Sequence, residues 1–244
     1  MPELPEVETI KRYLEKVIVD KKIASVEVLS EKQFLGKAKD IIGAKITGLE
    51  RRAKYLIIKL SNEKSLLIHL KLTGQLVWRP EVLESPGKTT RIIIYFDRGA
   101  LFFNDRRKFG WIRITTNNKE LITNNLAKLG PEPFSQDFSV DYLKQIFQKT
   151  SRPIKLVLLD QKKIAGIGNI YASEALFEAK INPKKPAKTL NQKEISRLKE
   201  AIVYVLKQGL KYGGSSAADE AYIRPDGSLG KFQQHFSVYQ KQGQ

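Results

Sequence analysis

The amino-terminal stretch at residues 1–18, MPELPEVETIKRYLEKVI, decides how the first half of the chain folds. Its apolar residues recur every three or four positions, which predicts a helix with one buried stripe. That stripe consists of Leu4, Val7, Ile10, Leu14, Val17 and Ile18. Glu3, Glu6 and Glu8 make the stretch too acidic for a secretory signal peptide. We expect Glu6 and Glu8 to complement the positive end of the helix dipole.

Segments with the composition and alternation of β-strands follow this helix. They cover residues 23–29, 45–60, 65–78, 91–96 and 100–103. Asp97-Arg98-Gly99 between the last two predicts a hairpin turn. The alternation stops after Ile114. The first half is therefore predicted to be a β-sandwich or barrel.

The second half shows helical patterns, at residues 140–149, 153–159, 169–179 and 192–211. Gly213 suits a left-handed cap beyond the last helix. The polar stretch 215–230 is too long for a passive turn, which predicts a mobile functional loop.

These patterns predict an α+β fold of two domains. We expect four consecutive parts: a β-sandwich domain at 1–116, a linker with one short helix at 117–133, a helical domain at 134–214 and a carboxy-terminal segment at 215–244. The linker is predicted from Gly130-Pro131-Glu132-Pro133, which interrupts regular structure.

The composition narrows the function. The 244 residues include 43 Lys and Arg against 26 Asp and Glu, a formal net charge of +17. Such a surplus favours a polyanionic partner such as nucleic acid. Zero cysteines exclude disulfides, cysteine-bound zinc, iron–sulfur clusters and thiol nucleophiles. The longest apolar run, residues 92–96, is too short for a membrane span, so we expect a cytoplasmic protein.

Pro2 and Glu3 are the first candidates for chemistry. Removal of Met1 leaves Pro2 as a secondary amine, and α-amino groups titrate near ~8, so a neutral fraction able to attack a sugar carbon exists at pH 7. Glu3 beside it can protonate a departing sugar oxygen. The alternative is structural: proline suits a helix start, and acidic residues suit the helix amino terminus.

Two further motifs have both a structural and a functional interpretation. The basic loop at 104–110 is either an ordinary turn or a wedge that fills the gap left by an extruded base. Gly166-Ile167-Gly168-Asn169 predicts a helix capped by Asn169, with backbone N–H groups that can hold an anion. A structural helix–turn–helix is the alternative.

The chain resembles the bacterial formamidopyrimidine-DNA glycosylase (MutM/Fpg) family, beginning with Met1-Pro2-Glu3-Leu4-Pro5-Glu6. The Arg-Lys-Phe-Gly segment favours this purine-specific branch over the endonuclease VIII branch. Further family motifs occur in family order across the chain: Arg51-Arg52-Ala53-Lys54-Tyr55-Leu56, His69-Leu70-Lys71-Leu72-Thr73-Gly74, Asn104-Asp105-Arg106-Arg107-Lys108-Phe109-Gly110, Leu129-Gly130-Pro131-Glu132-Pro133, Gly166-Ile167-Gly168-Asn169-Ile170-Tyr171-Ala172-Ser173-Glu174 and Gly213-Gly214-Ser215-Ser216.

This resemblance implies a helix–two-turn–helix (H2TH) domain and a role for each matching residue. Pro2 would attack the sugar, Glu3 would assist ring opening, and Lys54 would bind the lesion phosphate and assist elimination. The implied DNA contacts are Arg107, which pairs with the orphaned base, Phe109 and Leu72, which fill the gap, and Asn169, Arg152 and Lys155, which contact phosphates. His69 is either such a contact or a core residue.

The sequence departs from the family in four places. Relatives normally bind one structural zinc through four cysteines at the carboxy terminus, but this chain has none, so we expect no metal and either a naturally fingerless protein or a truncation. Leu72 replaces a common methionine and Thr89 a common histidine. Residues 217–225 are about two residues longer than the usual lesion-capping loop.

The resemblance implies a bifunctional DNA glycosylase and AP lyase that excises oxidised purines, including 8-oxoguanine and formamidopyrimidines, and nicks the strand by β,δ-elimination. Its expected partner is double-stranded DNA with oxidised or abasic sites, bound by a monomer near the nucleoid in a positive cleft between the domains. One alternative is a non-catalytic binder of damaged DNA. Another is an RNA- or ribosome-binding basic protein, which accounts for the charge but not for Pro2 and Glu3.

Overall fold

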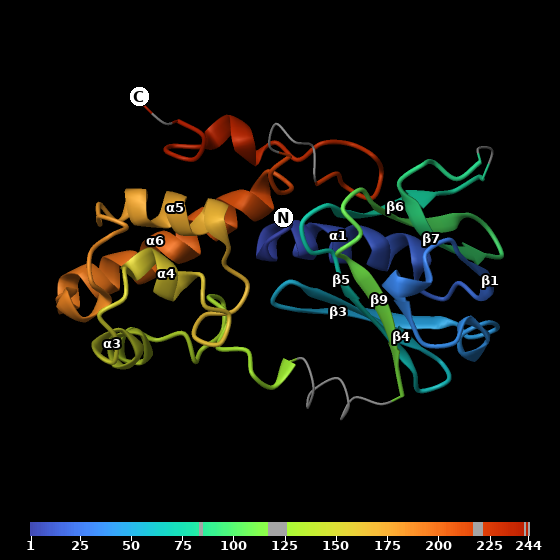
Figure 1. The fold of residues 1–244 in the computed structure, drawn as a ribbon, viewed down its shortest axis with the longest axis horizontal. Helices are drawn as coiled ribbons and strands as arrows, with labels where there is room; N and C mark the ends of the chain where they lie inside the picture. Colours follow the sequence, from blue (N-terminus) through green and yellow to red (C-terminus); the bar gives the residue numbers. More distant parts are fainter. Residues whose placement is uncertain (83–84, 117–125, 217–221, 242, 244) are drawn as a thin grey trace.

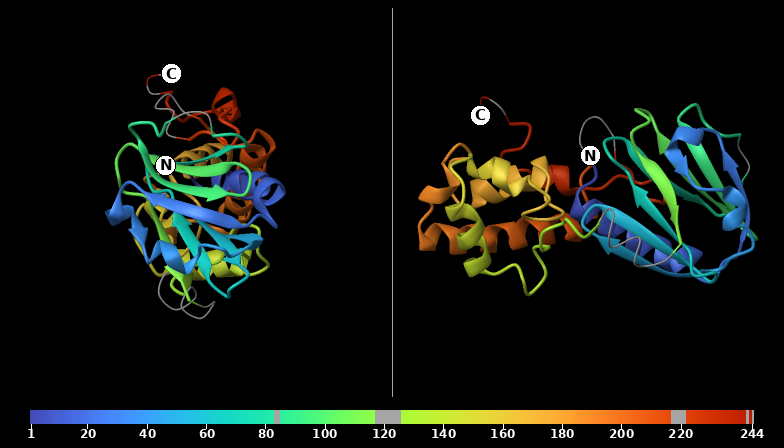
Figure 2. Two further views of the ribbon diagram at one scale, coloured as in Figure 1. Left: turned by 90° about the vertical axis from the view of Figure 1, so that its right-hand side faces the viewer. Right: turned by 60° about the horizontal axis from the view of Figure 1, so that its bottom comes forward.

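The computed structural model describes residues 1–244 except 83–84, 117–125, 217–221, 242 and 244. Figure 1 and the right view of Figure 2 both show the helices of the second half at one end and the strands at the other. The amino terminus lies between them. The predicted α+β class is confirmed.

Two sheets form the β-sandwich. The first has the order β1-β7-β8-β6 and is antiparallel throughout. The second has the order β2-β9-β5-β4-β3 and is antiparallel except between β2 and β9. The strands are β1 (Ile23–Val28), β2 (Phe34–Leu35), β3 (Ile46–Arg52), β4 (Tyr55–Leu60), β5 (Ser65–His69), β6 (Gly74–Arg79), β7 (Thr90–Phe96), β8 (Ala100–Asp105) and β9 (Trp111–Thr115).

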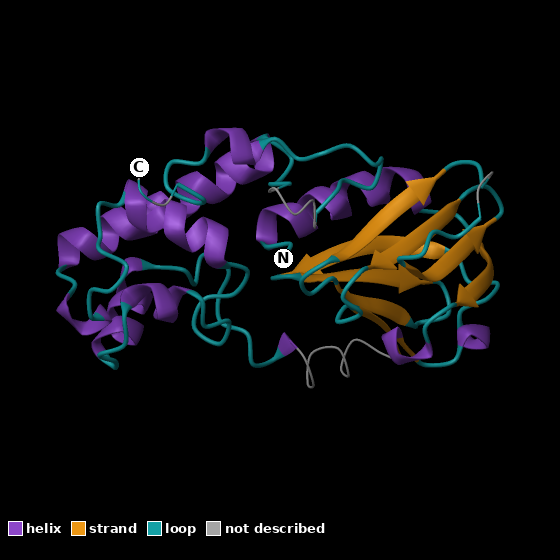
Figure 3. Ribbon diagram, turned by 45° about the horizontal axis from the view of Figure 1, so that its top comes forward, coloured by secondary structure: helices purple, strands orange, loops and turns teal. Residues whose placement is uncertain are grey.

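Helix α1 (Leu4–Ile18) lies alongside the strands (Figure 3). Its stripe of Val7, Ile10, Leu14 and Ile18 packs with apolar residues of both sheets in one core. Short 3₁₀ turns, η1 (Glu31–Gln33) and η2 (Ala38–Asp40), flank β2. The predicted helix is therefore the element that closes the sandwich.

Two predicted strands are each two strands in the structure. Residues 45–60 form the hairpin β3–β4, which turns at Ala53 with a left-handed φ of +52°. Residues 65–78 divide at 70–73, where the chain leaves one sheet (β5) and enters the other (β6). Apolar content is high on both sides of each turn, and neither turn contains a Pro-Gly or Asn-Gly signal. Strands β2 and β9 were not predicted.

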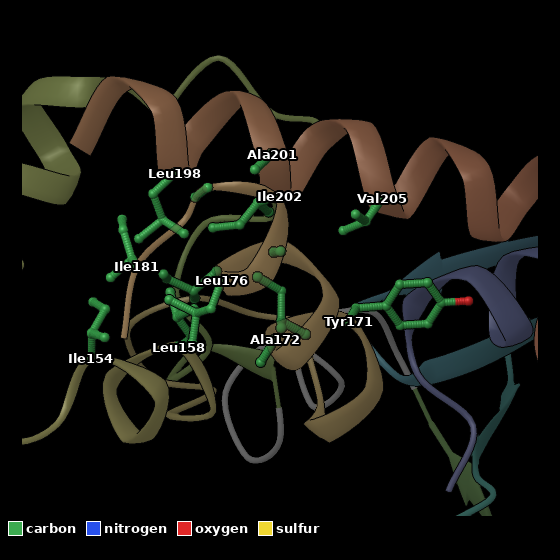
Figure 4. Close-up of a cluster of buried hydrophobic side chains, with 14 of the residues drawn as sticks. Ile154, Leu158, Tyr171, Ala172, Leu176, Ile181, Leu198, Ala201, Ile202 and Val205 are labelled. Carbon is green, nitrogen blue, oxygen red and sulfur yellow. The ribbon is translucent and has the colours of Figure 1, made fainter. Parts of the chain in front are cut away.

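The helical half contains α3 (Val140–Gln148), α4 (Ile154–Leu158), α5 (Asn169–Glu178), η4 (Ala187–Thr189), α6 (Gln192–Lys211) and η5 (Phe232–His235). Figure 4 shows the cluster in which α5 and α6 pack face to face. The left-handed cap is confirmed, because Gly213 has a φ of +70°. Leu4 of α1 belongs to this second core, so the first helix joins both halves.

The two separate cores support the division into domains, and we propose residues 117–133 as the linker. The short helix expected there and the middle of the loop at 215–230 fall on residues 117–125 and 217–221, outside the described residues. Across the described residues, no helix is long and apolar enough to span a membrane.

Candidate active site

Glu3 lies where the two halves meet. It precedes the first residue of α1, and only 2% of its side chain is exposed. Its Oε2 accepts a hydrogen bond from the N–H of Gly168 at 2.6 Å, and its Oε1 accepts one from the N–H of Ile170 at 2.9 Å. These donors form the amino terminus of α5, whose dipole favours an anion. The Glu3 carboxyl group therefore occupies the anion site that the glycine motif predicted.

The glycines of this motif permit that approach. A Cβ on Gly168 would lie 2.4 Å from Cδ of Glu3, so a larger residue would displace the carboxyl group. Gly166 has a φ of +96°, which disfavours other residues, and its carbonyl accepts the N–H of Leu4 at 3.0 Å. Pro2 is buried immediately beside this junction.

Asn169 does not cap α5, which corrects our prediction. Gly168 is the N-cap and Asn169 is the first helical residue, with an exposed side chain. The reason is that Glu3 already satisfies N–H groups at this helix end, the task an Asn169 cap would have performed.

Lys54 follows Ala53 at the β3–β4 turn and is 6% exposed. Burial lowers its pKa, and the charge of Glu3 opposes that shift. Burial likewise raises the pKa of Glu3 to about 7, and the charge of Lys54 opposes that rise. No described residue forms a hydrogen bond or ion pair with the Lys54 ammonium. Glu3, with a pKa of about 7, is thus influenced by the charge of Lys54, a buried lysine that forms no ion pair with a described residue.

Glu132 clamps the turn that presents Lys54. Its Oε1 accepts hydrogen bonds from the N–H of Ala53 at 2.8 Å and from Nη1 of Arg52 at 3.0 Å. Its Oε2 forms an ion pair with Nη2 of Arg51 at 2.7 Å, and Arg51 also pairs with Glu8. Sequence reasoning missed this residue, because Gly130-Pro131-Glu132-Pro133 was interpreted only as part of a family motif and as a linker signal.

Glu6 and Glu8 form specific contacts in addition to the helix-dipole role that we expected for them. Glu6 is buried and accepts hydrogen bonds from the hydroxyl of Tyr171 at 2.8 Å and from the N–H of Ser215 at 2.9 Å. In Figure 4 the Tyr171 hydroxyl points away from the helical core. Glu6 thereby ties α1 to α5 and to the start of the loop at 215–230.

Leu72, Arg107 and Phe109 project from two neighbouring loops. Leu72 lies between β5 and β6, and the other two lie between β8 and β9. The Arg107 guanidinium carbon lies 5.3 Å from the ring centroid of Phe109, whose side chain is 54% exposed. The N–H of Arg107 donates to the hydroxyl of Thr73, the residue after Leu72, so the structure places the loops that carry the three predicted gap-filling residues side by side.

His69 belongs to the sheet. Its ring packs edge-on against Tyr55 with centroids 4.5 Å apart, and its Nδ1 accepts the N–H of Lys71 at 3.0 Å. Burial lowers the pKa of His69 to about 3, so the ring is neutral at pH 7. This environment matches the alternative in which His69 is a core residue rather than a DNA contact.

The predicted phosphate contacts of the helical half are partly brought together. Lys155 and Asn169 line the same groove, a space of about 630 Å³ between α4, α5 and residues 238–240. Arg152 lies outside that lining and pairs with Asp160 at 3.7 Å. Among the described residues, no three His, Cys, Asp or Glu side chains gather as metal ligands, and the chain has no cysteine. The residues present therefore do not fit a four-cysteine zinc site.

Comparison with known proteins agrees with this geometry. Residues 1–112 match the family model described as the formamidopyrimidine-DNA glycosylase N-terminal domain, and residues 129–221 match the formamidopyrimidine-DNA glycosylase H2TH domain. The formamidopyrimidine-DNA glycosylase of Moorella thermoacetica is 41% identical over 248 residues, which cover 100% of this chain and 90% of that relative.

Solved structures are similar over the same extent. Wild-type Lactococcus lactis Fpg in complex with DNA containing N7-benzyl-Fapy-dG has a TM-score of 0.88 and 37% identity, covering 98% of this chain and 88% of that one. Its complex with abasic-site DNA gives 0.88 and 36%, covering 97% and 87%. Fold and site thus define a DNA glycosylase of the repair class. The chain belongs to the formamidopyrimidine-DNA glycosylase (Fpg) family.

Proposed function

We propose that this protein excises oxidised purines, such as 8-oxoguanine and formamidopyrimidines, from duplex DNA and then nicks the abasic strand by β,δ-elimination. The observation that carries the proposal is the Glu3 carboxyl group, buried beside Pro2 and held by the amino terminus of α5 with a pKa near 7. The Lactococcus relative bound to Fapy-type and abasic-site DNA supports the substrate class.

The proposed reaction begins when removal of Met1 converts the Pro2 amide into a secondary amine. The amine attacks C1′ of the extruded nucleoside, the C1′–N bond breaks, and the amine proton leaves with the base. Glu3 then protonates O4′, the C1′–O4′ bond breaks, and an iminium forms between Pro2 and C1′. The resulting Glu3 carboxylate is stabilised by the α5 N–H groups and by the charge of Lys54.

Strand cleavage follows from the iminium. Loss of a C2′ proton expels the 3′ phosphate (β-elimination), loss of a C4′ proton expels the 5′ phosphate (δ-elimination), and water releases Pro2 from the remaining sugar fragment. Lys54 is the nearby compact cation that would bind the lesion phosphate.

Recognition of the lesion would use the exposed side chains. Arg107, Phe109 and Leu72 would fill the gap left by the extruded base, which offsets part of the unstacking cost of a few kcal/mol. Lys155, Asn169 and Arg152 would contact phosphates, which adds affinity without sequence preference. We place the protein in the cytoplasm with the nucleoid, acting as a monomer.

Borohydride reduction tests the proposal because it converts an iminium into a stable protein–DNA crosslink. With an oxidised-purine duplex, we expect a crosslink that peptide mapping assigns to Pro2 and that Pro2→Gly largely abolishes. A matched control keeps Pro2 but adds one residue before it, which acylates its nitrogen and should abolish the crosslink completely. A crosslink on Lys54, or full yield from either variant, would refute the nucleophile. Tight lesion binding with no base release would favour the non-catalytic alternative.

A further inference from the structure

Asp105 is a buried carboxylate at the base of the loop that carries Arg107 and Phe109. Only 1% of its side chain is exposed. Its Oδ1 accepts hydrogen bonds from the hydroxyl of Thr73 and, at 3.1 Å, from the N–H of Arg107. Its Oδ2 accepts the N–H of Gly110 at 2.7 Å and Nε2 of Gln33 at 3.0 Å. One side chain therefore fixes both ends of the loop at 106–110.

Thr73 connects this loop to its neighbour. Its hydroxyl donates to Asp105 and also accepts the N–H of Arg107 at 3.0 Å. Thr73 directly follows Leu72 in the turn between β5 and β6, which is closed by the N–H of Gly74 on the carbonyl of Leu70 at 2.9 Å. The backbones that present Leu72 and Arg107 are thus joined through one hydroxyl group.

The side chain of Gln33 contacts both Asp105 and the end of the loop at 106–110. Its Nε2 donates to Oδ2 of Asp105 and to the carbonyl of Gly110 at 2.8 Å, while its own Oε1 is buried with no hydrogen-bond partner in the described part of the chain. Reversing the amide would place that oxygen against two acceptors, so the donors must face Asp105. The Gln33 amide is therefore oriented by its two acceptors, Asp105 and Gly110, and its Oε1 faces the other way.

These hydrogen bonds hold a loop whose side chains face solvent. Asp105 forms no ion pair with a described residue, so its oxygens are committed to the loop backbone and to the side chains of Thr73 and Gln33. The loop that it holds exposes Phe109 and the Arg107 guanidinium, which forms no ion pair within the described chain. The carboxylate binds the backbone of Arg107 and leaves its charge available to a ligand.

We propose that Asp105 and Thr73 are positioning residues that hold Leu72, Arg107 and Phe109 as one preassembled wedge for the gap left by an extruded base. Preassembly avoids the entropic cost of ordering two loops when DNA binds. This inference rests on the proposed function and assigns Asp105 and Thr73 an action through the loops that carry Leu72, Arg107 and Phe109.

A matched pair of Thr73 variants tests it. Thr73→Val keeps the side-chain volume and removes the hydroxyl, whereas Thr73→Ser keeps the hydroxyl. A hydrogen bond to a charged group, once lost, accounts for about tenfold or more in an equilibrium or rate. We expect kcat/KM for excision from an oxidised-purine duplex to fall about tenfold or more in Thr73→Val, and Thr73→Ser to stay within about twofold of wild type.

A second substrate separates positioning from simple damage to the fold. At a preformed abasic site no base has to leave the stack, so nicking by Thr73→Val should fall by at most about threefold. Wild-type excision by Thr73→Val would overturn the inference, and so would equal losses in excision and nicking. Failure of the wild type to excise would refute the proposed function instead. In that case DNA affinity tests the wedge: Thr73→Val should lower the ratio of affinities for oxidised and undamaged duplex about tenfold.

Discussion

Gly168→Ala tests whether the approach of Glu3 to α5 is required for the chemistry. The backbone of Gly168 is extended, with φ −132°, so alanine suffers no conformational strain there. The effect is steric, because the new Cβ would lie 2.4 Å from Cδ of Glu3. Carbon atoms prefer separations of about 3.5–4.0 Å, so the carboxyl group must retreat by roughly 1 Å.

A retreat of that size breaks the hydrogen bonds at 2.6 and 2.9 Å to Gly168 and Ile170. Each bond contributes about 1.5–3 kcal/mol when the acceptor is ionised, so above pH 7, where Glu3 is a carboxylate, the free energy of unfolding should fall by about 3–6 kcal/mol. The lower entropy of the unfolded alanine chain offsets about 0.4–1 kcal/mol of this loss. Because a 1 Å misplacement of a reacting group costs about 100-fold, excision should fall by at least that factor.

Single-turnover excision from an oxidised-purine duplex and thermal denaturation measure the two effects. Gly48→Ala is the matched control, because a Cβ there meets no described atom within 4 Å. Its excision should stay at the wild-type value, and its free energy of unfolding should be unchanged or higher by about 0.4–1 kcal/mol. The reasoning is refuted if Gly168→Ala excises within about threefold of wild type at full stability.

Three further predictions concern the same site. Glu3 must be protonated to donate, so its ionisation above about pH 7 should lower activity, whereas deprotonation of the Pro2 amine near ~8 should raise activity. The pH profile of kcat/KM should therefore be bell-shaped, and Glu3→Gln should lose the decline at alkaline pH. Glu132→Gln should lower the free energy of unfolding by about 1–3 kcal/mol and impair nicking at abasic sites more than excision, because it releases the Lys54 turn. Arg107→Ala should weaken binding to a lesion duplex more than to an undamaged one at the same salt concentration, whereas equal losses would indicate a simple phosphate contact.

Local sequence patterns were sufficient to predict those helices and strands whose periodicity and end signals lie within the element itself. The α6 bounds agree because one apolar face runs between an Asn191 cap and Gly213. The division of residues 65–78 between two sheets was missed, because buried strands of either sheet have the same apolar composition. Strand β2 is only two residues long and depends on its pairing with β9.

The sequence was sufficient to name candidate residues of the site, but not to predict how they contact one another. The resemblance singled out Glu3 and Lys54 but could not show that the donors to Glu3 come from residues 168–170. The roles of Glu132, Thr73 and Asp105 also escaped prediction, because each depends on a hydrogen bond to a group distant in sequence. The donors are the N–H of Ala53 for Glu132, the N–H of Arg107 for Thr73 and the side-chain amide of Gln33 for Asp105. A single sequence contains no record of those pairings.

The long sequence separation between Glu3 and its hydrogen-bond donors governs when the chain becomes reactive during synthesis. A nascent chain that has folded only its first half lacks the α5 amino terminus, which holds Glu3, and it lacks Glu132, which holds the Lys54 turn. Glu3 is then hydrated and ionised at neutral pH, and it has no proton to donate to a sugar. On the proposed mechanism, the acid that opens the sugar ring therefore depends on residues that lie 165 and 167 positions further along the chain.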